Sequence, residues 1–295
     1  MPGAVNRTKT PLEPLVDALE GATGLDAPAQ AVGERVRAAL QPGQVKDALS
    51  GTWLGHALHP ILTDVVIGSF VSVSVLDILG GDKDGRAAER LLAVGLAAYG
   101  PTALTGVSDW ADSELGDPRV RRVGLVHAAT NAAAASLYTA SLLARRRGAR
   151  RRGSALALAG AAALGGGGFL GGHLTFARGV GVDQTAFDPG PDEWTAALDA
   201  GELVAGEPKR VVVDDTPVLL VRHDEGVHAL HDRCSHRGCG LSTGDIEGEV
   251  VTCPCHGSRF DLRDGSVLRG PATAPQPVYE VRESAGRIEV RVRAS

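Results

Sequence analysis

Two long windows without a charged side chain constrain this chain more than any other feature of its sequence. Residues 123–144 and 153–177 contain no Asp, Glu, Lys or Arg, and a helix needs about 20 apolar residues to cross a bilayer core. A third uncharged window, 91–108, is shorter, and residues 60–80 contain only two aspartates. The pattern predicts four membrane-spanning helices, at about 60–80, 90–108, 123–144 and 153–177.

A soluble four-helix bundle is the alternative interpretation. Helices of a soluble bundle carry a polar face, which the two uncharged windows lack. The chain also has 39 glycines, and helices in lipid associate through small residues that let their backbones approach closely. We therefore predict an all-α transmembrane domain over 55–180, embedded in the lipid of a cell membrane and preceded by an amphipathic segment at 1–54.

The charge of the loops predicts an orientation. The segment from Arg145 to Arg152 reads RRRGARRR, with six arginines and no acidic residue. Short loops of this kind are enriched on the cytoplasmic side of a membrane. With four spans, both ends of the chain are then expected to face outward.

Five polar residues lie within or next to the predicted spans: His56, His59, Asp109, His127 and His173. Because successive spans run in opposite directions, all five are expected at the same end of the bundle. Ionisable groups at membrane depth are costly and often functional. Histidines on facing helices could ligate a metal or haem, or bind a quinone. The alternative is that these side chains hydrogen-bond one another and cap helix ends.

The composition changes after residue 180. Residues 1–180 contain 18 Lys and Arg against 15 Asp and Glu, whereas residues 181–295 contain 12 against 20. An acidic region with few aromatic side chains does not suit nucleic acid binding. Short β-rich runs separated by Gly, Pro and Asp-Asp turns predict an antiparallel all-β domain over 192–295, after a linker at 181–191. The predicted fold is therefore two-domain, with helices first and a β sandwich or barrel second.

All four cysteines lie within 22 residues, in two loops of the β domain. Cys234 and His236 form a Cys-x-His pair, and Cys253 and His256 form a Cys-x-x-His pair. Two thiolates and two imidazoles are the ligand set of a Rieske [2Fe-2S] centre, in which the cysteines bind one iron and the histidines the other. Zinc is the alternative. Structural zinc sites usually separate their cysteines by two to four residues and their histidines by three to five, and these four candidate ligands show neither spacing.

The same loops resemble a known family over about residues 191–295. They are similar to the Rieske domain, in particular to its disulfide-containing, high-potential subclass from quinol-oxidising cytochrome complexes. The resemblance implies four ligands of a [2Fe-2S] cluster: Cys234, His236, Cys253 and His256. It also implies a disulfide between Cys239 and Cys255, a pair that Rieske ferredoxins and oxygenase domains lack. Two spare buried thiols are the alternative, and a disulfide suits a domain outside the reducing cytosol.

Five further residues match positions around the cluster in the resembled proteins. Ser258 matches a residue whose hydroxyl hydrogen-bonds a cluster sulfide, which raises the reduction potential. Phe260 stands where those proteins place a tyrosine that reaches a ligand cysteine, so we expect a lower potential, within about −150 to +300 mV. Gly270 and Pro271 resemble the proline loop that covers the cluster, with a turn of no such role as the alternative. Leu241 takes the place of an apolar lid, and the edges of the ligand histidines are expected to be exposed.

The membrane half resembles an uncharacterised family of four-helix bacterial membrane proteins over roughly residues 10–185. The resemblance rests on GTWLGHALHPILTDVVIG (51–68), TGVSDW (105–110), GLVHAATN (124–131) and GGHLTFARGVGVD (171–183). In that family the first motif usually reads Gly-His-Pro-x-His-Pro, and here Ala57 replaces the first proline. The resemblance implies a topology and little about function.

These features together predict a multi-pass protein of a bacterial cell membrane with its Rieske domain on the outer, non-cytoplasmic face. It is expected to pass single electrons between quinol or haem and another redox protein. It is expected to be an oxidoreductase-type carrier or subunit and not a self-contained enzyme. One alternative is a Rieske component of a separate oxygenase, since the 39 residues after His256 leave no room for an oxygenase iron domain. Another is a membrane transporter regulated by a redox-sensing domain.

Overall fold

The computed structural model describes residues 11–80, 84–223 and 226–293. The described residues form two compact units. The helical unit comprises 11–38, 63–80, 84–103 and 113–180, and the β unit comprises 39–62, 104–112, 181–223 and 226–293. The predicted order of a helical half followed by an all-β half is confirmed. The β unit also includes two stretches from the helical half of the sequence.

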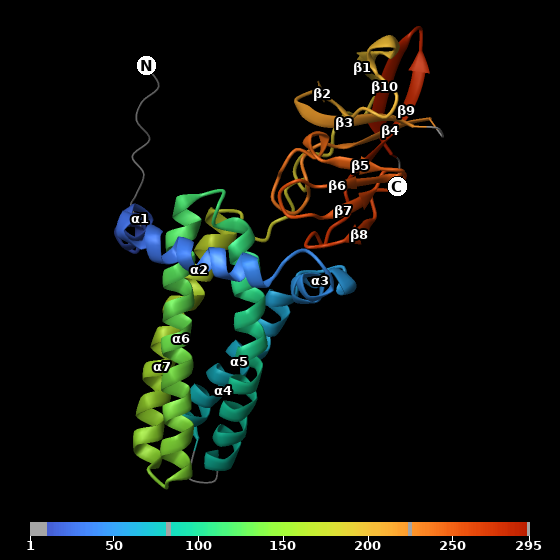
Figure 1. Ribbon diagram of the computed structural model, residues 1–295. Coiled ribbons are helices and arrows are strands. Elements are labelled where there is room, and N and C mark those ends of the chain that lie inside the picture. The colour runs from blue at the N-terminus through green and yellow to red at the C-terminus, as the bar shows by residue number, and fades with distance from the viewer. Residues whose placement is uncertain (1–10, 81–83, 224–225, 294–295) are drawn as a thin grey trace. The chain divides into compact units, whose positions relative to one another are not determined.

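Seven α-helices lie in the described part of the chain before residue 180 (Figure 1). They are α1 (Glu13–Gly21), α2 (Asp26–Ala39), α3 (Gln44–Ser50), α4 (Leu58–Leu79), α5 (Gly85–Ser113), α6 (Pro118–Arg146) and α7 (Arg150–Gly172). A π-helical turn at His173–Ala177 extends α7. Three of them, α4, α5 and α7 with its extension, are long and apolar enough to cross a membrane, by length and composition alone. Apolar side chains on their surfaces, such as Val71 and Ile78, are half exposed or more.

Helix α6 differs from the sequence prediction. It contains the uncharged window 123–144 but is not among the three helices with sufficient hydropathy. Polar side chains such as His127, Thr130 and Asn131 lower its hydropathy without adding charge. Helix α4, whose window contains two aspartates, has the highest mean hydropathy of the three at 1.9. Charge and hydropathy therefore select different sets of helices, and both criteria rest on composition alone.

Aromatic rings and glycines pack the helical unit. Phe70 of α4 stacks on Tyr138 of α6, with ring centroids 3.8 Å apart and planes inclined by 13°. Gly95 of α5 and Gly160 of α7 lie against these rings, because a Cβ atom there would stand 2.5 Å from Phe70 and 3.2 Å from Tyr138. Four helices thus meet at one stacked pair, which agrees with the role of small residues in helix association.

A buried ion pair joins α4 to α6. Arg145 Nη2 lies 2.5 Å from Asp77 Oδ2, and each side chain is 2% exposed. Ser154 of α7 donates a hydrogen bond to the other carboxylate oxygen at 2.9 Å. Loss of either partner would leave a buried charge uncompensated, so removing one side chain of this pair is expected to destabilise the helical unit.

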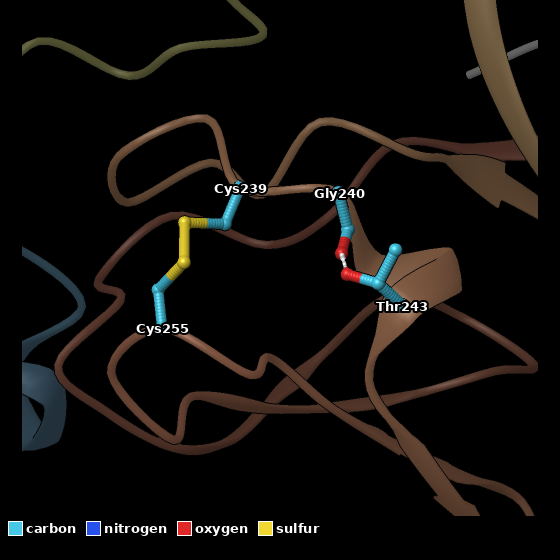
Figure 2. Close-up of a disulfide and its surroundings, with 4 residues drawn as sticks. All are labelled: Cys239, Gly240, Thr243 and Cys255. Carbon is cyan, nitrogen blue, oxygen red and sulfur yellow. Dashed lines mark hydrogen bonds between the residues drawn. A yellow bond between two sulfur atoms is a disulfide. The ribbon is translucent and has the colours of Figure 1, made fainter. Parts of the chain in front are cut away.

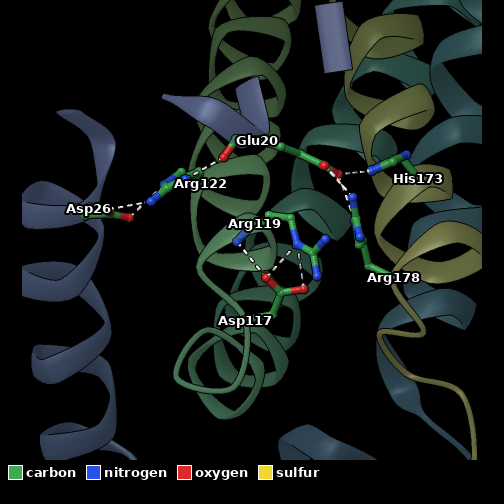
Figure 3. A network of polar contacts seen from close by, with 7 residues as sticks. All are labelled: Glu20, Asp26, Asp117, Arg119, Arg122, His173 and Arg178. Carbon is green, nitrogen blue, oxygen red and sulfur yellow. Dashed lines mark hydrogen bonds and ion pairs between the residues drawn. The ribbon is translucent and has the colours of Figure 1, made fainter. Parts of the chain in front are cut away.

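Charged side chains attach α1 and α2 to the rest of the helical unit (Figure 3). Glu20, near the end of α1, accepts hydrogen bonds from His173 Nε2 and Arg178 Nε, each at 2.7 Å. Asp26, at the start of α2, accepts two from Arg122, at 2.9 and 2.7 Å. The predicted amphipathic segment is therefore held by ion pairs as well as by its apolar face.

Ten antiparallel strands form two sheets in the β unit. They are β1 (Thr195–Asp199), β2 (Lys209–Val213), β3 (Thr216–His223), β4 (Gly226–His231), β5 (Asp245–Glu247), β6 (Val250–Thr252), β7 (Arg259–Asp261), β8 (Val267–Arg269), β9 (Val278–Ser284) and β10 (Arg287–Val292). The six-stranded sheet has the order β1-β10-β9-β4-β3-β2, and the four-stranded sheet has the order β5-β6-β7-β8. One apolar core contains Leu219 and Leu230 together with Cys234, Cys253 and Phe260. The cysteine loops are therefore anchored in the core.

The predicted linker packs on this domain. Thr216 Oγ1 donates a hydrogen bond to the carboxylate of Asp188, and His231 Nε2 lies 3.1 Å from Asp188 Oδ2. Gln184 N–H donates to the carbonyl of Ser235 at 3.0 Å. These contacts attach residues 181–191 to the first cysteine loop.

Candidate metal centre

The first cysteine loop follows β4 and closes on itself. Cys234 N–H donates to the carbonyl of Cys239, and Gly238 N–H donates to the carbonyl of Cys234, both at 2.8 Å. Gly238 has a φ of 76°, a left-handed conformation that glycine adopts without steric cost. One tight turn therefore presents both Cys234 and His236.

The second loop, between β6 and β7, repeats this pattern. Cys253 N–H donates to the carbonyl of Ser258 at 2.8 Å, and Gly257 N–H donates to the carbonyl of Cys253 at 3.0 Å. Gly257 has a φ of 74°. The two loops share one local fold, and each supplies one cysteine and one histidine.

A disulfide joins the two loops (Figure 2). Cys239 and Cys255 are bonded, with Cα atoms 6.4 Å apart, inside the usual range of about 4.4–6.8 Å. Close by, Thr243 Oγ1 donates to the carbonyl of Gly240 at 2.9 Å. The predicted pairing is confirmed, and the alternative of two spare thiols is wrong.

The two remaining cysteines, Cys234 and Cys253, are free and buried. A hydrogen bond between their thiol groups lowers the pKa of Cys253 to about 7 and raises the pKa of Cys234. Backbone N–H groups of four neighbours also donate to the sulfur atoms: His236, Arg237, Cys255 and His256. Two sulfurs that share one proton among N–H donors are suited to bind one iron as thiolates.

The two histidines form a second pair. The ring centroids of His236 and His256 lie 5.0 Å apart, with the rings perpendicular. Nδ1 of His236 is buried and has no hydrogen-bond partner among the residues that the structure describes, whereas its Nε2 lies 3.6 Å from Asp112 Oδ2. A buried nitrogen without a partner is costly, so this atom fits a metal ligand. Burial lowers the pKa of both imidazoles, which favours the neutral form that binds metals.

Nowhere in residues 11–80, 84–223 and 226–293 do three His, Cys, Asp or Glu side chains surround one point as a single-metal site. The four side chains instead form a cysteine pair and a histidine pair. This arrangement suits a dinuclear cluster, because each of its irons takes two of the four ligands. The residues present therefore fit a [2Fe-2S] cluster better than a mononuclear zinc ion.

Three of the residues predicted to surround the cluster are fully buried. Ser258 Oγ accepts a hydrogen bond from Ala272 N–H at 3.0 Å, which leaves the hydroxyl hydrogen for a second bond. Phe260 and Leu241 are 0% exposed and share one apolar core with both free cysteines. Phe260 has no polar atom with which to hydrogen-bond a ligand, and Leu241 lies in the core beside the cysteines.

The predicted proline loop packs against the segment 39–62 of the same unit. Asp47 accepts a hydrogen bond from the backbone of Gly270, and Thr52 Oγ1 donates to the carbonyl of Ala272 at 3.3 Å. A Cβ atom on Gly270 would stand 2.1 Å from Thr52 Oγ1, so this approach requires glycine. Pro271, the next residue, is buried and follows a cis peptide bond.

Sequence reasoning missed Gln276, which holds the first loop. Its side chain is 1% exposed. Nε2 donates to the carbonyls of His231 and Arg233, each at 2.6 Å, and Oε1 accepts from Ser235 N–H at 3.0 Å. One amide thus satisfies three backbone groups. No motif marks this residue, because it lies 41 positions after Ser235.

The expected exposure of the histidine edges is wrong for His236. Its side chain is only 11% exposed, because the ring faces Asp112 at the end of α5. Sequence reasoning assigned no role to Asp112 or to Lys46, whose Nζ lies 2.8 Å from the same carboxylate. Both residues have charged side chains, which ordinarily lie in solvent.

Two of the predicted membrane-domain residues lie in the helical unit. His127 Nδ1 lies 2.8 Å from the carbonyl oxygen of Gly167, and His173 pairs with Glu20 (Figure 3). Both rings therefore make internal hydrogen bonds, as the alternative interpretation expects.

The other three predicted membrane-domain residues, His56, His59 and Asp109, lie in the β unit. His59 Nδ1 is 3.1 Å from Thr105 Oγ1, and the carbonyl of Asp109 accepts a hydrogen bond from Arg237 Nη2 at 3.4 Å. His56 is exposed, with Nδ1 3.1 Å from the carbonyl of Ala57. A haem or quinone bound by the five residues stays a prediction.

Two family descriptions match the chain. Residues 193–280 match the Rieske [2Fe-2S] domain. Residues 55–184 match a family described as "Predicted membrane protein (DUF2231)". The two matches follow one another with a gap that falls in the region of the predicted linker.

Several relatives share the Rieske part. The anthranilate 1,2-dioxygenase ferredoxin subunit of Burkholderia cepacia is 35% identical over 100 residues, which cover 34% of this chain and 93% of the subunit. Sulredoxin of Sulfurisphaera tokodaii is 33% identical, over 34% of this chain and 98% of sulredoxin. A solved structure, the ferredoxin of carbazole 1,9a-dioxygenase from Nocardioides aromaticivorans IC177, is 29% identical over 35% of this chain and 100% of its own, with a TM-score of 0.33.

The match to the dioxygenase ferredoxin subunit covers almost its entire length. The Rieske family match at residues 193–280 includes both cysteine-histidine loops. The second family match lies wholly in the helical half. The chain therefore belongs to the Rieske [2Fe-2S] family, with a ferredoxin-type electron-carrier domain that follows a DUF2231 membrane-protein domain.

Proposed function

We propose that this chain is a membrane-anchored Rieske protein that passes single electrons between a membrane donor, quinol or haem, and another redox protein. The pairing of two buried thiols with two imidazoles in loops joined by a disulfide is the observation that carries the proposal. A [2Fe-2S] cluster bound there supplies a one-electron carrier. Cys234 and Cys253 would hold one iron, and His236 and His256 the other.

Two features favour a membrane donor. His236 faces Asp112 of α5, a helix apolar enough to cross a membrane. The bonded pair Cys239–Cys255 is the feature by which the sequence resembles the quinol-oxidising subclass. Under this proposal, the electron would enter the cluster through the histidine pair.

A second candidate function is that of an electron donor to a separate oxygenase. This candidate is supported by the names of the relatives, which include the ferredoxin subunit of anthranilate 1,2-dioxygenase and ferredoxin CarAc of Metapseudomonas resinovorans. Under this candidate, the reduced cluster would pass its electron to a different chain that contains the oxygenase iron.

Redox titration of the full-length protein in detergent, followed by EPR, tests the proposed function. We expect a Rieske-type signal with a midpoint potential within about −150 to +300 mV, and reduction of the cluster by a water-soluble quinol. An iron-free protein, or a potential near the −400 mV or so of plant-type ferredoxins, would contradict the proposal. A cluster that a one-electron dye reduces but quinol does not would favour the oxygenase-donor candidate.

We also propose that the Rieske domain lies on the outer face of the membrane. Six arginines between Arg145 and Arg152 favour a cytoplasmic position for the loop between α6 and α7, and a structural disulfide suits an oxidising compartment. Protease added to spheroplasts is expected to digest residues 192–295 while a cytosolic marker stays intact. Digestion in inverted vesicles only would place the domain inside.

A further inference from the structure

A buried ion pair lies beside the histidine edge of the candidate cluster site. Lys46 Nζ is 2.8 Å from Asp112 Oδ2, and the two side chains are 5% and 7% exposed. The same carboxylate oxygen lies 3.6 Å from His236 Nε2. All three residues belong to the β unit. One carboxylate therefore contacts both a lysine and a predicted iron ligand.

The lysine is held in place from a second direction. Lys46 Nζ donates to the carbonyl of Ser108 at 2.9 Å and contacts Ser108 Oγ at 2.8 Å. Ser108 and Asp112 lie one helical turn apart on α5. The ammonium group is thus bonded to two successive turns of this helix, and it fixes the carboxylate against His236.

The second histidine contacts the same residue. The His256 ring hydrogen-bonds the backbone of Asp112, and its centroid is 5.0 Å from that of His236. Both predicted histidine ligands therefore meet Asp112, one at the carboxylate and one at the backbone. Burying an ion pair is costly, and this pair lies beside the two histidines that would hold one iron of the cluster.

We propose that Asp112, held by Lys46, is a positioning residue for both histidines and lowers the reduction potential of the cluster that they hold. The inference rests on the proposed cluster. A negative charge near the iron ligands favours the oxidised cluster, because reduction adds an electron to the same site.

Lys46 opposes this effect with its positive charge, and the Arg237 guanidinium adds a further positive charge that acts on both histidines. The two halves of the ion pair therefore have opposite electrostatic effects on the cluster. Loss of Asp112 raises the potential, and loss of Lys46 lowers it. Simple damage to the site would shift the potential in one direction for both variants, so the signs distinguish an electrostatic role from a structural one.

The test is EPR-monitored redox titration of full-length Asp112→Asn, Asp112→Glu, Lys46→Met and a control, Asp199→Asn. Asp199 carries the same charge in an exposed pair with Arg287 on the β unit. We expect Asp112→Asn to increase the equilibrium constant for reduction about tenfold, which is about 59 mV for one electron. Asp112→Glu should return most of the way to wild type, and Lys46→Met should shift the potential in the opposite direction.

The inference is overturned if Asp112→Asn shifts the potential no further than Asp199→Asn does, or if Lys46→Met shifts it upward. If the Lys46→Met variant does not accumulate, the potentials of Asp112→Asn and Asp112→Glu are compared. A potential for Asp112→Glu no nearer to wild type than that of Asp112→Asn would then overturn the inference. A wild-type protein without a Rieske EPR signal would instead refute the proposed cluster, so the two failures are distinguishable.

Discussion

Replacing Cys253 by serine is expected to abolish iron binding. Cys253 is 2% exposed, its thiol hydrogen-bonds that of Cys234, and its backbone N–H closes the second loop. Serine preserves that loop but supplies a hydroxyl, which is a far poorer ligand for iron than a thiolate. Loss of one ligand leaves one iron with a single cysteine. We expect no cluster iron, no acid-labile sulfide and no Rieske EPR signal in the purified variant.

Pro254→Ser is the matched control for this variant. It introduces the same residue one position later, at an exposed site that supplies no predicted ligand. The control is expected to keep a full complement of two irons. If Cys253→Ser retained wild-type iron and an unchanged EPR spectrum, the assignment of Cys253 as a ligand would be wrong.

Replacing both Cys239 and Cys255 by serine is expected to destabilise the cluster domain by about 3 kcal/mol while leaving the cluster in place. The disulfide closes a loop with a sequence separation of 16, and a loop of about 15 residues corresponds to about 3 kcal/mol in the chain-entropy treatment. With a urea dependence of about 1–3 kcal/mol/M, the midpoint for loss of cluster absorbance in the full-length protein should fall by about 1–3 M.

Reduction provides the control for the disulfide prediction. Dithiothreitol should lower the urea midpoint of the wild type by the same amount and should leave the double variant unchanged. Equal midpoints for oxidised wild type and double variant would show that the bond between the two loops contributes nothing to stability. Loss of iron from the folded double variant would show that it is needed to assemble the site.

The ligand residues are predictable because their information is local. Cys234 and His236 share one tight turn, as do Cys253 and His256, so their spacing in the sequence reports their spacing in space. Gln276 reaches the first loop from 41 residues away and contacts backbone only. A single sequence has no local pattern for such a contact.

The ion pair beside the histidines was unpredictable for a related reason. Lys46 and Ser108 are separated by 62 positions, and Asp112 meets His236 from a different part of the chain. Taken alone, each charged residue looks like an ordinary surface side chain. The segment around Lys46 was accordingly predicted to be part of an amphipathic tail, although it lies against the cysteine loops.

The sequence predicts where the long helices lie better than it predicts which of them are apolar enough to cross a membrane. The windows at 60–80, 90–108, 123–144 and 153–177 each coincide with a long helix, because apolar runs of this length with few or no charges rarely form anything else. Helix α6 shows the limit of the criterion, since uncharged polar residues such as Asn131 reduce hydropathy without interrupting the run.

The buried pair of Asp77 and Arg145 also has a consequence for biosynthesis. Asp77 is synthesised 68 residues before Arg145, so the end of α4 has no guanidinium partner while α5 and most of α6 are being made. An unpaired carboxylate among packed helices is costly. Helix α4 therefore gains the partner of this buried carboxylate only after the end of α6 has been synthesised.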